Sequence, residues 1–454
     1  MSGPKVVRLV TIEEVREICR GHLARLDATL ARWEKICRRN DAMTDEDVLI
    51  MRSRRAEIAL LMTKERYLDL QKQVPLEMQW IETDLVKRLA AATQRVADAS
   101  RRARRREMLA AQLLQRATLT AEQRRDLEAI AQGNDINGVN AETVLGEALR
   151  RTASTGGRDD DDTELQALAQ RLSVGQKGET LDDWLAANPS EDESGSSGDS
   201  IDSAIAGLGV AGAVKDAERL AARYRAILTE PASNARKMRT DTLLLEVSRT
   251  LERRRQAVRQ LAELEITLAE ARAVLDPAHA SLIADAETAL LHDDAATAAA
   301  VRERLSEAIA SQCQSFAAAS RRRAVLAALA EVGYEAREGM ETGEPAGGRL
   351  VARRATNPDM GVEIAGGSAS ARLQLRPVRF ASAGSTGDSS KDRDIETIWC
   401  SDFQRLLDRL GTLDADLVVE RVTPVGEVPV MVVQELQGES ERRSSIPLSR
   451  QFSS

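Results

Sequence analysis

Aromatic residues, cysteines and histidines are all scarce in this sequence of 454 residues. Aromatics make up 2% of the chain, and there are four cysteines and three histidines. The cysteines are widely scattered, so they do not form the framework of a disulfide-stapled domain. A structural zinc site needs four ligands held together. The sequence therefore predicts no metal site and no cofactor.

Long uninterrupted apolar runs are also missing. No run reaches the 18 or so residues that a membrane-spanning helix needs, so no membrane contact is expected. The opening stretch, MSGPKVVRLVTIEEV, lacks the continuous apolar core of a signal peptide. The formal net charge is -8, which argues against affinity of the whole chain for nucleic acid. We therefore expect a cytoplasmic protein, and the excess of arginine over lysine suggests a bacterial source.

What the sequence does contain is a mixture typical of long amphipathic helices. Charged residues make up 30% of the chain and hydrophobic residues 43%, mostly Ala, Leu, Val and Ile. Ala, Leu, Arg and Glu are strong helix formers. We predict a mainly α protein whose long antiparallel or coiled-coil helices form two segments. An acidic disordered linker separates the segments, and a small C-terminal α+β domain follows them.

The predicted domain boundaries follow changes in composition. They are 1–153 for a short strand and a helical bundle, 154–203 for the acidic Ser/Gly-rich linker, 204–322 for the second helical segment, 323–437 for the α+β domain, and 438–454 for a disordered tail.

Capping signals and apolar periodicity place the individual helices. They predict helices over about 12–39, 45–73, 75–117, 120–133, 140–151, 213–228, 234–275, 278–292 and 293–332. Pro75 is interpreted as a first-turn residue. The segment KVVRLV, residues 5–10, is β-branched and is expected to pair with a sheet elsewhere in the chain.

The C-terminal region changes from helical periodicity to partial alternation. Strands are expected over about 348–355, 361–366, 371–380, 416–422 and 428–433, with one helix over about 394–411. Residues 392–407, DRDIETIWCSDFQRLL, combine acidic residues at the predicted helix start with an apolar face. Cys400 is interpreted as a small buried residue of that face, because a cysteine nucleophile needs a base and this domain has no histidine.

More charge surrounds this helix start than a cap needs, which predicts an ionic network or a docking site. The candidate residues are Asp392, Arg393, Asp394, Glu396, Glu363 and Arg376. Asp359 and Glu363 also resemble the strand-borne carboxylates of metal-dependent nucleases. The next strand departs from that pattern, since it supplies Gln374 and Arg376 where an acid and a lysine are expected.

Two further motifs were weighed. GLGVAG, residues 207–212, matches a dinucleotide-binding GxGxxG, but an acidic linker precedes it where a strand is required, so a small-residue helix start is favoured. The basic run RRARRR is a candidate polyanion site, formed by Arg101, Arg102, Arg104, Arg105 and Arg106. Alternatively it pairs with the acidic linker at 159–162 and 191–193, or is a solvated helix face.

No motif identifies an enzyme. The leading hypothesis is a non-enzymatic scaffold or adaptor, in which elongated helices space or oligomerise and the α+β domain docks an unidentified protein partner. Half-covered apolar stripes favour self-association through coiled coils, although antiparallel hairpins within one chain would cover them equally well. The alternatives are a hydrolase with its site in the α+β domain, and polyanion or nucleic-acid binding through the Arg-rich helix 87–116.

Overall fold

The computed structural model describes residues 4–116, 119–134, 141–155, 194–336, 350–366, 372–381, 389–412, 416–424 and 427–434. The described residues are mostly helical, with one small sheet. The chain forms two compact units. The first consists of residues 1–31, 49–79 and 261–454, and the second of residues 32–48 and 80–260. Most of the predicted linker and the whole predicted tail lie outside the described residues. No helix within the described ranges is long and apolar enough to cross a membrane.

All but the third of the described N-terminal helices begin within one residue of the positions that the capping signals predicted. These helices are α1 (Ile12–Arg39), α2 (Asp45–Thr63), α3 (Tyr67–Arg116), α4 (Ala121–Ala131) and α5 (Ala141–Thr155). The Thr11 hydroxyl accepts a hydrogen bond from the Glu14 backbone N–H at 3.3 Å at the start of α1. Thr120 and Gln123 form a reciprocal capping box at the start of α4.

The predicted break at Pro75 is wrong. The chain instead turns at Glu65, whose φ is +58°, so α2 ends at Thr63 and α3 begins at Tyr67. Pro75 lies inside α3, where its missing N–H removes one helical hydrogen bond. Neither glycine nor proline marks the real turn, so the sequence carried no strong signal for it.

The second helical segment begins earlier than predicted. Its helices are α8 (Ser194–Val210), α9 (Val214–Leu228), α10 (Asn234–Val274), the 3-10 turn η2 (Pro277–His279), α11 (Ala280–Leu291) and α12 (Ala295–Val332). Helix α8 starts inside the range 154–203 that was predicted as linker. Ile201 and Leu208 of α8 are buried against Leu220 and Tyr224 of α9. This packing overrides the weak helix propensity of the Ser/Gly-rich sequence.

The sheet combines strands from both ends of the chain. Its strands are β1 (Lys5–Val10), β2 (Tyr334–Ala336), β3 (Leu350–Arg354), β4 (Asn357–Ala365), β5 (Arg372–Ala381), β6 (Asp416–Val422) and β7 (Met431–Gln434). The order is β2-β3-β4-β5-β1-β6, and β7 pairs in parallel with the C-terminal part of β5. Strand β1 lies between β5 and β6 and is antiparallel to both, which confirms that residues 5–10 join a distant sheet.

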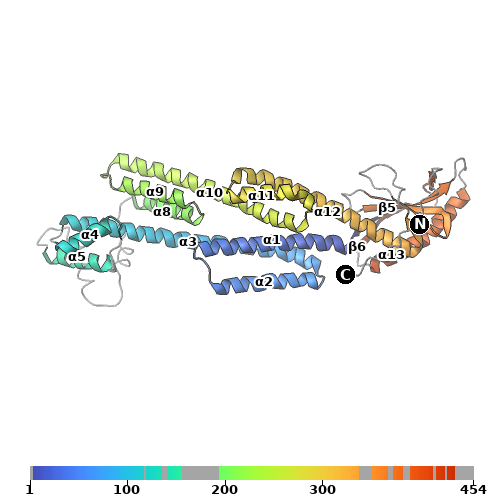
Figure 1. The fold of residues 1–454 in the computed structure, drawn as a ribbon, viewed down its shortest axis with the longest axis horizontal. Coiled ribbons are helices and arrows are strands. Elements are labelled where there is room, and N and C mark those ends of the chain that lie inside the picture. The colour runs from blue at the N-terminus through green and yellow to red at the C-terminus, as the bar shows by residue number, and fades with distance from the viewer. Residues whose placement is uncertain are drawn as a thin grey trace. The chain divides into compact units, whose positions relative to one another are not determined.

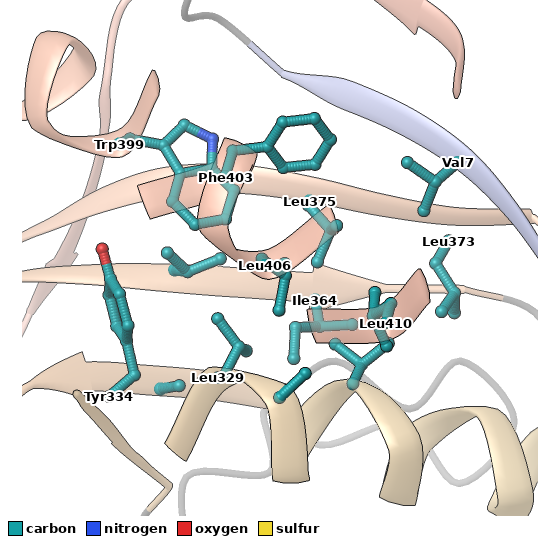
Figure 2. Packing of buried hydrophobic residues seen from close by; sticks show 14 of the residues in the cluster. Val7, Leu329, Tyr334, Ile364, Leu373, Leu375, Trp399, Phe403, Leu406 and Leu410 are labelled. Atoms are coloured by element: carbon teal, nitrogen blue, oxygen red, sulfur yellow. The ribbon is translucent and has the colours of Figure 1, made fainter. Parts of the chain in front are cut away.

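One face of this sheet, called the covered face below, packs against α12 and α13 (Ser389–Thr412), as Figure 1 shows. Its core includes Val7, Ile364 and Leu375 from three strands, with Leu329 of α12 and Leu406 of α13 (Figure 2). The sheet, α13 and the end of α12 are called the sheet domain.

Helices α1 and α12 are joined where they meet the sheet domain. The Arg321 guanidinium donates to the Glu14 carboxylate at 2.8 Å, and both side chains are largely buried. Beside this pair, the hydroxyls of Thr11 and Ser320 hydrogen-bond at 2.7 Å. The chain therefore leaves and re-enters the sheet domain through two helices that are bonded to each other.

Candidate functional site

Helix α13 presents an apolar face to the sheet, as its residue spacing predicted. Ile395, Trp399, Phe403, Leu406 and Leu410 recur at three- and four-residue steps, and all are buried. The Trp399 and Phe403 rings lie 5.6 Å apart, centroid to centroid, at one end of the core (Figure 2). The charged start of α13 therefore begins an ordinary amphipathic helix.

The six predicted ionic residues do not form one cluster. Asp392 lies 3.3 Å from Arg379, whose side chain is only 8% exposed, on the covered face. Glu363 and Arg376 face each other directly across β4 and β5 and form an ion pair. Glu363 alternates with Val362 and Ile364 of the covered core, so this pair lies on the opposite face of the sheet.

The other three predicted residues occupy different environments on α13. Arg393 and Asp394 are exposed, whereas Glu396 is 2% exposed. Asp359, the second carboxylate of the nuclease-like pattern, is exposed on β4. Asp392 and Glu363 are therefore each paired with an arginine, and the two pairs lie on opposite faces of the sheet.

A buried carboxylate that the sequence did not indicate lies between α13 and the strands β2 and β3 at one edge of the sheet. Asp402 is 0% exposed, and its Oδ2 accepts a hydrogen bond of 2.8 Å from the Tyr334 hydroxyl. Arg354 lies 3.2 Å away and Arg405 forms a second ion pair. Burial, followed by the hydrogen bond to Asp402, raises the pKa of Tyr334 well above its ordinary value. This network ties α13 to β2 and β3.

A buried lysine was also missed. Lys5 of β1 is 2% exposed, and its Nζ lies 3.9 Å from the centroid of the Phe403 ring and 5.7 Å from that of the Trp399 ring. Burial lowers the pKa of Lys5, and nearby Cys400 partly opposes that shift. The aromatic rings stabilise the ammonium through cation–π contact. Only the alternation of KVVRLV, which places Lys5 on the same face as Val7, could have indicated it.

The arrangement of these groups favours structural pairing over proton transfer. Asp392 and Asp402 are each paired with an arginine, and Asp402 also accepts a hydrogen bond from Tyr334. Within the described residues, no group of three or more His, Cys, Asp or Glu could hold a metal ion.

Strand β6 is an outer strand of the sheet, at the end of the strand order opposite β2. Among the described strands it pairs with β1 alone, so its other edge carries no described strand. Val418 and Val419 are 44% and 37% exposed. An edge strand of this kind presents backbone N–H and C=O groups that a further strand can pair with.

The Arg-rich part of α3 pairs largely with α8. Arg104 donates to Asp202 at 2.7 Å and stacks over the Tyr224 ring at 5.0 Å. Arg101 lies 3.3 Å from Asp199 and also pairs with Asp98. The predicted acidic partners at 159–162 and 191–193 lie outside the described residues. Among the residues that the structure describes, Asp199 and Asp202 pair with these arginines.

The remaining arginines of this candidate site are less buried. Arg102 and Arg105 are exposed and Arg106 is half-buried. Two of the five arginines in the predicted polyanion site are thus held by carboxylates of the same chain, which reduces the positive charge open to a polyanion.

The GLGVAG motif forms the end of a helix. Gly207 approaches Leu251 so closely that an added Cβ would lie 3.3 Å from that side chain. Gly212 has a φ of +87° and ends α8. The Val210 and Ala211 carbonyls accept hydrogen bonds from Arg39 and Arg254, at 2.9 and 3.2 Å. The predicted helix start is therefore wrong, and the motif serves close packing and C-capping.

No protein-family model, curated protein or solved structure matches this chain.

Proposed function

We propose that this chain is a non-enzymatic scaffold or adaptor whose sheet domain docks a protein partner, while its paired helices act as a spacer. The observation that carries the proposal is the outer edge of β6, which pairs with no further strand among the described residues. An extended segment of the partner would add a strand there and bond its backbone to β6.

The burial of the charged groups supports docking at β6 over docking at the start of α13. Glu396 and Glu363 are each 2% exposed, so a partner could not reach either carboxylate without unfolding the helix or the sheet. Val418 and Val419 are accessible on a strand that is already held by β1.

The joined helices support the spacer role. Because α1 and α12 are bonded through Glu14 and Arg321, the sheet domain is held by two helices. A force that acts on one of these helices is therefore also carried by the other.

The same contacts weaken the hydrolase alternative. Glu363, on which the nuclease-like pattern depended, is paired with Arg376. A carboxylate neutralised in this way is poorly suited to bind a divalent metal, because the metal would have to displace the guanidinium.

The test compares the wild-type chain with a Val418→Lys/Val419→Lys variant, in which two like charges oppose strand addition. Affinity capture and mass spectrometry first identify companions, and each companion is then purified and its dissociation constant measured directly. We expect at least one companion to bind the variant at least tenfold more weakly than the wild type.

The matched control is Met238→Lys/Leu245→Lys, which changes two exposed residues of α10. It should bind like the wild type, and circular dichroism should be the same for all three chains. The proposal is wrong if every purified companion binds the β6 variant and the wild type equally well.

A further inference from the structure

Helix α2 carries an apolar stripe that faces away from the rest of its fold. Leu49, Ser53, Ala56 and Leu60 are all exposed, with Leu49 and Leu60 at 67% and 50%. Their steps of four, three and four residues are the spacing of a helix-pairing seam. The buried face of α2 lies on the other side and includes Met51, Ile58 and Leu61. The seam is therefore additional to the face that α2 already packs.

We propose that this stripe is the surface through which two copies of the chain pair, with the two α2 helices antiparallel. The spacing of the stripe, with a leucine at each end and a small residue at each inner position, is symmetric about its midpoint between Ser53 and Ala56. In an antiparallel pair centred there, Leu49 of one copy faces Leu60 of the other, and Ser53 faces Ala56. A two-fold interface requires this self-complementarity.

Side-chain size along the stripe fits this arrangement. The two small residues, Ser53 and Ala56, meet at the centre, where they allow the helix backbones to approach closely. The two leucines lie one turn further out and cover the small residues from both ends. Dimerisation would bury the side chains of Leu49 and Leu60, and this removal of apolar surface from water would drive association.

The ends of α2 are complementary in charge. The first turn contains Asp45 and Glu46, which are exposed; beyond the last turn Lys64, Glu65 and Arg66 are exposed and together carry a net positive charge. In the antiparallel pair the acidic start of each helix lies beside the Lys64 end of the other, twice by symmetry. A parallel pair would place like charges together at each end, so the charge pattern favours the antiparallel one.

The length of α2 sets the expected strength. Its 19 residues span about 28 Å, so the contact is smaller than a standard protein interface. A reversible dimer with a dissociation constant on the order of micromolar is expected.

This inference extends the proposed scaffold role, and it concerns a different surface from β6. Sedimentation equilibrium of the full chain, from about 1 to 100 µM, measures it. We expect the wild type to form dimers and a Leu49→Glu/Leu60→Glu variant to associate at least tenfold more weakly. Glutamate keeps helix propensity, so the variant should fold normally.

The control variant is Leu245→Glu/Leu291→Glu, which changes exposed leucines of α10 and α11 and should dimerise like the wild type. The inference is overturned if the wild type is monomeric throughout, or if the α2 variant dimerises as well as the control. Partner binding that persists in a monomeric chain would leave the β6 proposal standing.

Orientation is tested by mixing Ser53→Cys chains with Ala56→Cys chains under mild oxidation, with the wild type as the background control. Antiparallel pairing predicts disulfides mainly between unlike chains. Disulfides mainly between like chains would contradict the antiparallel arrangement.

Discussion

Replacing Leu9 by alanine tests whether the N-terminal strand is an integral part of the sheet domain. Leu9 is 0% exposed and belongs to the core formed by β4, β5, α12 and α13. Truncation of such a buried leucine costs about 2–4 kcal/mol, from lost apolar burial and the cavity left behind. Strand β1 lies between β5 and β6, so the loss should reach strands more than 350 residues away in sequence.

Native-state hydrogen exchange followed by mass spectrometry measures this loss of stability separately for peptides of the sheet domain. A loss of about 2–4 kcal/mol corresponds to amide exchange in β4 and β5 that is roughly 30- to 1000-fold faster. Peptides from α8 and α9, which belong to the other compact unit, should be unaffected. The control is Arg8→Ala, an exposed neighbour for which a change below about 0.5 kcal/mol is expected. Unchanged exchange in β5 of the Leu9→Ala chain would refute the reasoning.

Three further predictions concern the helices. Arg104→Met should lower the free energy of unfolding by about 3–5 kcal/mol, because it leaves the Asp202 carboxylate buried without its partner. A urea titration measures this loss. Adding Asp202→Asn to the same chain should restore part of it. Burial raises the pKa of Glu270 and Arg25 partly opposes that shift, so stability falls as pH rises from the unfolded-state pKa to the raised folded-state pKa and stays lower above it. Glu270→Gln should therefore raise the melting temperature at pH 7 but not at pH 3, and an equal effect at both values would contradict this assignment. Gly212→Ala should lower the free energy of unfolding by about 1–2 kcal/mol, because φ is +87° at this position. An unchanged free energy of unfolding in the same titration would contradict this expectation.

Local sequence patterns were sufficient where an element is defined by its own residues. KVVRLV predicted β1 with its observed bounds, Lys5–Val10, because β-branched residues alternate between flanking breakers. Thr11 with Glu14 predicted the start of α1, and residues 416–422 predicted β6. The apolar spacing from Ile395 to Leu410 likewise predicted that α13 would cover the sheet.

The elements that were missed depend on distant partners. Helix α8 begins in a Ser/Gly-rich stretch and is stabilised by packing on Tyr224 and Leu220, which no local pattern shows. Strand β2 has three residues, too few for a periodic signal. Pro75 was misplaced because the real turn, at Glu65, contains no residue that favours a positive φ.

The candidate site was predicted less well than the fold, because charge density says nothing about which face a residue occupies. Glu363 and Asp392 were grouped together, yet the pleat of β4 and the position of Arg379 place them on opposite faces of the sheet. Asp402 and Lys5 were not singled out, because their burial depends on Tyr334, Trp399 and Phe403 from other elements.

The most direct test of partner docking at β6 is hydrogen exchange of the full chain with and without a purified partner. The account predicts that amides of residues 416–422 become protected in the complex, while those of the opposite edge, β2, do not change. Protection that spares 416–422 would contradict docking at β6, even if the partner binds tightly.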